Sequence, residues 1–337
     1  MELLHIRNLR CIQQAELALS QGLIWFFGGN GAGKTTLLEA AYVLDRGRSF
    51  RGRRAGPLRT HGADKTQLSA VLIEGESRWA LRWVDGQRSD GPRPRGAVRF
   101  VGASTFGLLE GGPSLRRRFI DWSMFHVEPG AGLALGNAGR LAQQRNAWLR
   151  SGARGYRVWD GGYAEAYAVL AEHRCRFVGA VNTIFVQLTA SLFPGGPLSL
   201  EWEGSLSASE AMSALSRQWA ADRSRGFTQL SPWRGDLVIL RGDRRWGGSR
   251  GENKLAAMLL QLAVHRVAAE TCPSAVVLVD DPYGEVSPAL VLPVLREWVS
   301  QADQVLVAAL SEPPAGLNAD KVFHVEHGQT SVLARHC

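Results

Sequence analysis

The first 27 residues show hydrophobic patterns that are typical of β-strands. Residues 3–6 are mostly apolar, residues 15–19 alternate between apolar and polar, and residues 23–27 form a continuous apolar run. Such a run predicts a strand that is buried on both faces. Glycines follow at once, and apolar residues then recur at helical spacing over residues 35–44. The N-terminal segment therefore predicts a buried strand, a glycine loop and a helix, in that order.

The middle of the chain predicts a hairpin followed by a long helical block. Residues 67–74 and 78–84 are two strand-like segments on either side of a glycine. Residues 115–192 are mostly helical in pattern, with apolar positions every three or four residues toward their C-terminal end. Residues 193–235 are rich in proline and glycine at both ends, and we expect loops there.

Helix and strand patterns alternate again near the C-terminus. A helical pattern begins at Gly251, and an apolar strand follows at residues 275–279. A second helix begins at Ser287, and a strand covers residues 304–310. This alternation at both ends predicts one α/β domain that an α-helical insertion interrupts. We expect its N-terminal part at residues 1–114, the insertion at 115–230 and its C-terminal part at 231–337.

Composition limits the class of protein. Of the 337 residues, 45% are hydrophobic, so the chain can bury a substantial core. It has no run of 18 or more apolar residues, and we expect no membrane association. The four cysteines are far apart, which predicts neither a zinc site nor disulfides and favours a reduced, cytoplasmic protein. The net charge of +8 favours an anionic partner such as nucleic acid.

The glycine loop matches the phosphate-binding pattern G-x-x-x-x-G-K-[ST]. Glycines allow backbone N–H groups to surround an anion, and the following helix directs its positive dipole end toward the phosphates. We expect Lys34 to reach the β- and γ-phosphates of ATP and the Thr35 hydroxyl to bind Mg²⁺. The flanking strand and helix make an accidental glycine turn the weaker interpretation. The predicted ATP-binding residues of this loop are Gly28, Gly29, Asn30, Gly31, Ala32, Gly33, Lys34, Thr35 and Thr36.

Two acidic residues follow the strand at residues 275–279. Asp280 is expected to bind Mg²⁺ through water and Asp281 to polarise the water that attacks the γ-phosphate. Alone, such a pair is more often a solvated strand end, but together with the glycine loop it favours the Mg²⁺ interpretation. The predicted catalytic residues are thus Lys34 and Asp281, and the predicted metal ligands are Thr35 and Asp280.

A serine–glycine turn precedes the helix that leads into this strand. Ser249, Arg250 and Gly251 resemble the S-x-G signature of ATPases of the ABC and SMC class. The resemblance implies a motif that contacts the γ-phosphate of ATP bound to a second subunit, with the helix N-terminus adding donors. The alternative is a simple turn with a helix cap.

The chain resembles the RecF family of bacterial DNA replication and repair ATPases, which are related to SMC proteins. The resemblance is carried by residues 6–10, 37–42, 47–51, 112–122, 125–129 and 144–149. It implies an α/β fold, a P-loop ABC/SMC-type ATPase head with an α-helical lid or arm insertion. It also implies ATP and Mg²⁺ as cofactors and a homodimer that forms on ATP binding. The implied partners are gapped, single-stranded or duplex DNA and RecR- and RecO-type mediators, in a role of loading recombinase at single-strand gaps during the SOS response.

The sequence departs from the family pattern near the expected nucleotide site. Glu252 stands where the signature has Gln, and Trp233 stands where the family has His. The further departures are Ala103, Ser104, Ser287 and Ala308. We expect nucleotide binding to survive these changes, and hydrolysis stays open between a weak DNA-stimulated ATPase and an ATP-binding scaffold. A small-molecule kinase would share the glycine loop but would not need the signature motif.

Arginines crowd the segment after the first predicted helix. Arg side chains bind phosphates bidentately and can hold a DNA backbone without reading its sequence. A single exposed Arg is usually a solvated side chain, but the cluster favours phosphate contact. The predicted DNA-contacting residues are Arg46, Arg48, Arg51, Arg53 and Arg54.

Overall fold

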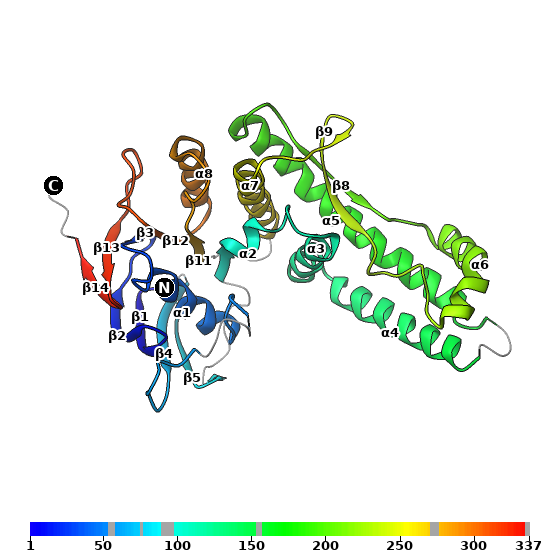
Figure 1. Cartoon of the computed structure of the whole chain (residues 1–337), viewed down its shortest axis with the longest axis horizontal. Helices are drawn as coiled ribbons and strands as arrows, with labels where there is room; N and C mark the ends of the chain where they lie inside the picture. Colours follow the sequence, from blue (N-terminus) through cyan, green and yellow to red (C-terminus); the bar gives the residue numbers. More distant parts are fainter. Residues whose placement is uncertain (53–57, 75–76, 89–97, 153–156, 270–275, 334–337) are drawn as a thin grey trace. The chain divides into compact units, whose positions relative to one another are not determined.

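The structure, a computed structural model, describes residues 1–52, 58–74, 77–88, 98–152, 157–269 and 276–333. Two units, each with its own packing, are built from segments that are far apart in sequence. Unit 1 contains Met1–Gly107, Gly248–Leu262 and Ala269–Cys337. Unit 2 contains Leu108–Gly247 and Ala263–Ala268. Figure 1 labels the helices and strands of both units.

A six-stranded sheet in unit 1 carries the glycine loop at the end of one of its central strands. The strands are β3 (Gly22–Phe27), β7 (Val98–Val101), β11 (Val276–Asp280), β12 (Gln304–Ala309), β13 (Lys321–Glu326) and β14 (Gln329–Val332). Their order is β14-β13-β3-β12-β11-β7, and all neighbours are parallel except β13 and β14. Trp25 of β3 pairs with Val307 of β12 on one side and Val322 of β13 on the other. The apolar run at residues 23–27 is therefore a buried parallel strand, as its pattern predicts.

An antiparallel sheet and helix α1 complete the core of unit 1. The sheet has the order β2-β1-β4-β5-β6, and the predicted hairpin is formed by β4 and β5, with Gln67 opposite Val84. The bounds are β1 Leu3–Leu9, β2 Ile12–Ala18, β4 Gln67–Glu74, β5 Ser77–Val84, β6 Gln87–Arg88 and α1 Lys34–Arg46. Helix α1 contacts strands of both sheets, and its apolar residues join one buried cluster with Leu4 and Ile24. Burial of β3 and α1 in that cluster fixes both ends of the glycine loop.

Three more helices involve unit 1. They are α2 (Ala103–Phe106), α7 (Arg250–Ala269), whose later residues belong to unit 2, and α8 (Pro288–Gln301). The two helices predicted from residues 251 and 287 are present at these positions. The strands β7, β13 and β14 were not predicted, because β7 is only four residues long and β13 and β14 carry polar side chains.

The described residues of unit 2 form helices α3 to α6, the end of α7 and a small antiparallel sheet. The helices are α3 (Pro113–Val127), α4 (Ala131–Arg150), α5 (Asp160–Leu192) and α6 (Ala208–Arg225), and the strands are β8 (Ser199–Glu203), β9 (Asp236–Arg241) and β10 (Arg244–Arg245). The helical block predicted at residues 115–192 corresponds to α3, α4 and α5. Helices α4 and α5 lie side by side (Figure 1), and α5 also contacts α6 and β8.

The prediction of loops at residues 193–235 is wrong, because β8 and α6 lie there. Helix α6 starts with a capping box between Ser207 and Glu210, but its buried residues are Ala211, Ala214, Leu215 and Asp222, which give a weak hydrophobic pattern. Strand β8 alternates in burial over only five residues. Because β8 pairs with β9, an insertion that ends at residue 230 would cut this sheet, and unit 2 extends to Gly247.

Helix α5 is long and apolar enough, by length and composition alone, to span a membrane. Its polar residues include Asp160 and Arg174, both buried in ion pairs inside unit 2. Together with its contacts to α4, α6 and β8, these ion pairs are typical of a helix in the core of a folded unit.

A buried arginine joins three helices of unit 2. The Arg145 guanidinium on α4 donates hydrogen bonds to Asp160 of α5 and Asp222 of α6, both at 2.8 Å, and to the Thr228 hydroxyl at 2.7 Å. The side chains of Arg145, Asp160 and Asp222 are fully buried. Because these charged groups are shielded from water, removing one of them would leave the others buried without a counter-ion, which is strongly destabilising.

Replacing Arg145 with Met should lower the free energy of unfolding of unit 2 by about 3–5 kcal/mol, because it leaves two buried carboxylates without their counter-ion. Urea unfolding measures this. Arg140→Met is the matched control on the same helix: Arg140 is exposed and donates only to Asn137, so its loss should cost less than about 0.5 kcal/mol. Equal stability of the two variants would contradict the structural role of Arg145.

Candidate nucleotide-binding site

The glycine loop between β3 and α1 has the backbone geometry of a phosphate cradle. Gly28, Gly31 and Gly33 have φ angles of 150°, 76° and 114°, a region that favours glycine. A Cβ on Gly28 would lie 2.1 Å from the carbonyl oxygen of Val325, so β13 excludes any side chain there. Residues 29–31 are exposed, and an anion can reach the loop from solvent.

Lys34 is held inside this loop. Its Nζ donates hydrogen bonds to the carbonyl oxygens of Gly28 at 2.9 Å and Gly29 at 2.7 Å, and only 9% of the residue is exposed. Burial lowers the pKa of Lys34, while attraction to Asp280 and Asp281 opposes this shift. An ammonium that carbonyl groups hold at this place can exchange them for phosphate oxygens, which bind a cation more strongly.

Thr35 and Asp280 come together from opposite ends of the chain. The Thr35 hydroxyl donates a hydrogen bond of 2.9 Å to Asp280 Oδ1. Burial raises the pKa of Asp280, whereas this hydrogen bond and the nearby Arg51 charge lower it. A hydroxyl beside a carboxylate at the edge of an anion cradle fits Mg²⁺, which takes oxygen ligands from one or two carboxylates and from substrate phosphates.

Asp281 lies immediately after β11 in a left-handed conformation. Its φ is 48°, and its N–H donates to the carbonyl oxygen of Ala308 at 2.9 Å. Its carboxylate lies over Gly284, where a Cβ would be 2.5 Å from Asp281 Oδ2. Asp281 is exposed, so water can reach its carboxylate. Its role in polarising that water stays a prediction.

The predicted signature turn is closed on itself by a capping box. The Ser249 N–H and hydroxyl both donate to Glu252 Oε2 at 2.8 Å, and the Glu252 N–H donates to Ser249 Oγ at 3.4 Å. Glu252 thus places a carboxylate against Ser249 of the predicted signature turn. Arg250 is 76% exposed and lies 3.6 Å from the Glu285 carboxylate. A Cβ on Gly251 would lie 2.6 Å from the Glu285 carbonyl oxygen, so this turn packs tightly on the loop after β11.

Lys254 is a functional candidate that the sequence analysis missed. It is 6% exposed, and its Nζ donates to the carbonyl oxygens of Asp281 and Gly284, both at 2.6 Å. The same ammonium lies 4.4 Å from the centre of the Phe106 ring of α2. Lys254 therefore joins the signature helix both to the loop after the two acids and to the segment that contains Ala103 and Ser104. The available signal was a lysine directly before the apolar run of residues 255–260, in a chain with only four lysines.

The predicted DNA-contacting arginines do not share one environment. Arg46 donates to the carbonyl oxygen of Val98 at 3.0 Å and lies 2.9 Å from the Asp45 carboxylate, so it is engaged inside the fold and not on the predicted DNA surface. Arg51 lies 3.8 Å from the buried Glu39 carboxylate and close enough to Asp280 to lower its pKa. Arg48 is exposed. Arg53 and Arg54 lie outside the described residues.

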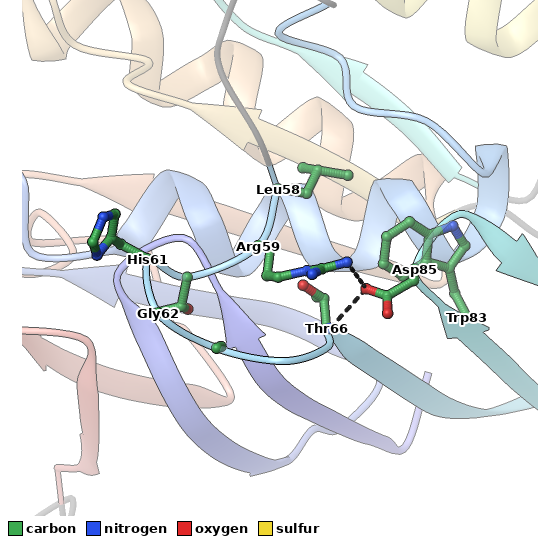
Figure 2. Close-up of a pocket in the computed structure, with 9 residues that line it drawn as sticks. Leu58, Arg59, His61, Gly62, Thr66, Trp83 and Asp85 are labelled. Atoms are coloured by element: carbon green, nitrogen blue, oxygen red, sulfur yellow. Dashed lines mark hydrogen bonds and ion pairs between the residues drawn. The ribbon is translucent and has the colours of Figure 1, made fainter.

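A further arginine of this stretch, Arg59, lines a pocket of about 400 Å³ on the antiparallel sheet. Figure 2 shows Arg59 and Thr66 converging on Asp85. The Arg59 guanidinium lies 3.3 Å from Asp85 Oδ1, and the Thr66 N–H donates to the same oxygen at 2.9 Å. The charge of Arg59 is thus balanced within the pocket and adds little to a basic surface.

Comparison with known proteins identifies the family. The DNA replication and repair protein RecF of Shewanella oneidensis is 30% identical over 355 residues, which cover 98% of each chain. The chain belongs to the RecF family. RecF of Yersinia enterocolitica is 31% identical over 358 residues, which cover 97% of each chain. Residues 3–43 also match a family model described as an AAA domain.

Solved structures agree with this family at the level of the fold. A structure of the recombination mediator protein RecF with ATP, from the RecFOR pathway, has a TM-score of 0.77 at 20% identity and covers 99% of this chain and 97% of its own. An Smc head bound to the C-winged helix domain of ScpA has a TM-score of 0.59 at 17% identity and covers 98% and 96%. The predicted P-loop ABC/SMC-type head is confirmed.

Replacing Lys254 with Met should loosen the loop after β11, because two charge-assisted hydrogen bonds to its carbonyls are lost. We expect amide hydrogen exchange over residues 281–286 to become about 10- to 100-fold faster. Lys321→Met is the control, since Lys321 donates to one carbonyl, that of Ala18, elsewhere in unit 1. If amide hydrogen exchange over residues 281–286 is equally fast in both variants, Lys254 does not stabilise this loop.

Proposed function

We propose that this chain is an ATP-binding protein of DNA repair and replication, which dimerises when ATP is bound and then holds DNA. The observation that carries the proposal is the hydrogen bond between Thr35 and Asp280 beside the buried Lys34, within a chain of the RecF family. By similarity to RecF proteins, its partners are gapped, single-stranded or duplex DNA and RecR- and RecO-type mediators that load recombinase in the cytoplasm.

The residues of the glycine loop have distinct tasks in this proposal. Backbone N–H groups of residues 28–33 and the α1 N-terminus surround the phosphates, and Lys34 neutralises the γ-phosphate. Thr35 and Asp280 would hold Mg²⁺, which would supply positive charge to the phosphate oxygens. Asp281 orients the attacking water and accepts its proton. Turnover is slow and DNA-stimulated, so that ATP serves mainly to hold the dimer together.

The second half of the ATP site comes from another copy of the chain. The hydrogen bonds of Ser249 are made within its own turn, to Glu252 and Asn253, while Arg250 is exposed to solvent. A helix N-terminus with an exposed arginine favours an anion that arrives from outside. In the SMC-type arrangement that anion is the γ-phosphate bound to the partner's Lys34 and Thr35.

Sedimentation velocity with and without ATP tests the proposal. The wild type should shift from monomer to dimer with ATP, and Asp281→Asn should keep the dimer because hydrolysis is slowed while the metal ligand Asp280 remains. Ser249→Arg should bind ATP but stay monomeric, since it adds bulk at the interface and leaves the glycine loop untouched. Normal dimerisation of Ser249→Arg would remove the signature turn from the mechanism.

A second candidate function, an ATP-binding scaffold with little hydrolysis, is favoured by the Glu252 carboxylate. In the dimer this carboxylate would face the γ-phosphate at the place where the family has a neutral Gln. Like charges oppose each other at an interface. The ATP-bound dimer would then be weak, and the two ATP sites at its interface would rarely be complete enough to hydrolyse ATP.

Replacing Glu252 with Gln should strengthen ATP-driven dimerisation by about 5- to 10-fold, because it removes the negative charge and Gln still closes a capping box. The dissociation constant of the dimer at saturating ATP measures this effect. Glu210→Gln is the matched control: Ser207 and Glu210 form the same capping box at the start of α6 in unit 2. A dimer of unchanged strength in Glu252→Gln would mean that Glu252 lies away from the phosphate.

A further inference from the structure

A second pocket, in unit 2, combines exposed aromatic rings with arginines. Its volume is about 410 Å³, and α3 supplies most of its wall. The residues that matter here are Arg117, Arg118, Asp121, Trp122, Phe125 and Trp233. Trp233 is one of the positions where the sequence departs from the family, and the ATP site does not use it.

The aromatic rings of this pocket are open to solvent. Trp122, Phe125 and Trp233 are 37%, 56% and 45% exposed, whereas Trp25 and Trp202 in the cores of the two units are 0% and 6% exposed. Two of them rest against glycines of α4: a Cβ on Gly132 would lie 2.7 Å from the Phe125 ring, and one on Gly139 would lie 3.5 Å from Trp233. Glycine at position 132 lets the Phe125 ring lie close to the helix backbone, and the Trp233 ring lies within van der Waals reach of Gly139.

The lining of the pocket carries two arginines and one carboxylate, Asp121, and both Asp121 and the neighbouring Asp236 already pair with other arginines. Arg116 binds Asp236 with two hydrogen bonds, of 2.9 and 2.8 Å, and Arg174 binds Asp121 with two, of 2.7 and 2.8 Å. Arg117 donates to the carbonyl oxygen of Gly235, which is uncharged. Burial and the nearby Arg174 charge lower the pKa of Arg117, as expected where cations outnumber anions. An anionic ligand would be attracted by this excess of positive charge.

We propose that this pocket binds single-stranded DNA, with bases stacked on Trp122 and Trp233 and the backbone phosphates held by Arg117 and Arg118. The proposal rests on the DNA-binding function proposed above and assigns a surface and a form of DNA to it. Every base has a face that stacks on an aromatic ring, and a single strand can turn its bases outward, whereas a duplex keeps them paired. The arginines supply the sequence-independent contacts that such a strand needs.

Fluorescence anisotropy with labelled oligo(dT) and with a duplex of the same length, on the full chain with ATP, tests the proposal. Trp233→Ala and Trp122→Ala should each weaken single-strand binding by about 5- to 100-fold, and Trp233→Phe should retain most of the affinity because it keeps a ring. Arg118→Gln should weaken single-strand binding. It should also make the slope of log affinity against log salt concentration shallower by the amount expected for about one phosphate contact. Duplex affinity should stay within about 2-fold of the wild type in the tryptophan variants.

Two exposed residues of unit 2 outside the pocket serve as controls. Phe227→Ala removes an exposed ring, and Arg223→Gln removes an exposed charge, and neither should change single-strand affinity by more than about 2-fold. ATP-driven dimerisation, measured in parallel, reports whether each variant is folded.

Three results would overturn the proposal. In the first, both Trp122→Ala and Trp233→Ala bind single strands as tightly as the wild type. In the second, these variants lose single-strand and duplex binding equally. In the third, they bind DNA normally but no longer bind a protein partner. The first leaves the proposed DNA function intact and removes only the pocket. If the wild type dimerises with ATP but binds no form of DNA, the DNA part of the proposed function fails as well.

Discussion

A hydrogen bond between Thr35 and Asp280 joins residues that are 245 positions apart, and the site depends on it. It exists because β3 and β11 lie in one parallel sheet, separated only by β12, so that the residues after their carboxyl ends meet at one edge. The burial of these strands fixes the positions of Lys34, Thr35 and Asp280 more firmly than local contacts would. Unit 2 can therefore be inserted in the sequence between β3 and β11, provided that both strands still pair with β12 in the sheet of unit 1.

The signature helix is coupled to this edge of the sheet through Lys254. One ammonium holds two carbonyls of the loop after β11 and lies against Phe106 of α2. The start of the signature helix, the loop after β11 and α2 thus share a single buried cation. Because Lys254 contacts two backbone carbonyls and one ring, these contacts do not depend on the side chains of Ala103, Glu252 or Ser287.

Sequence patterns were sufficient where burial was continuous or a motif fixed the backbone. The strand at residues 23–27, the glycine loop, the hairpin at 67–84 and the helices of residues 115–192 are all present in the structure. The patterns failed where small or polar residues form the buried face, as in α6 with Ala211 and Ala214, and where strands are short, as in β7. In the candidate site, the glycine-loop motif and the acid-tipped strand were enough to predict Lys34 and Asp280 as candidates, and the structure places both at one edge of the sheet. The sequence could not indicate the contacts of Lys254 with the Asp281 and Gly284 carbonyls or of Arg46 with the Val98 carbonyl, because only the folded chain brings these groups together.

In the dimer that we propose, each complete ATP site combines the glycine loop of one subunit with the signature turn of another. Mixing Lys34→Ala with Ser249→Arg, two variants that should each stay monomeric with ATP, tests this arrangement. A mixed dimer would contain one intact site, built from Lys34 of the Ser249→Arg chain and Ser249 of the Lys34→Ala chain. We expect the mixture to form ATP-dependent dimers in sedimentation experiments although neither variant does so alone. A mixture that stays monomeric at saturating ATP, under conditions in which the wild type dimerises, would contradict it.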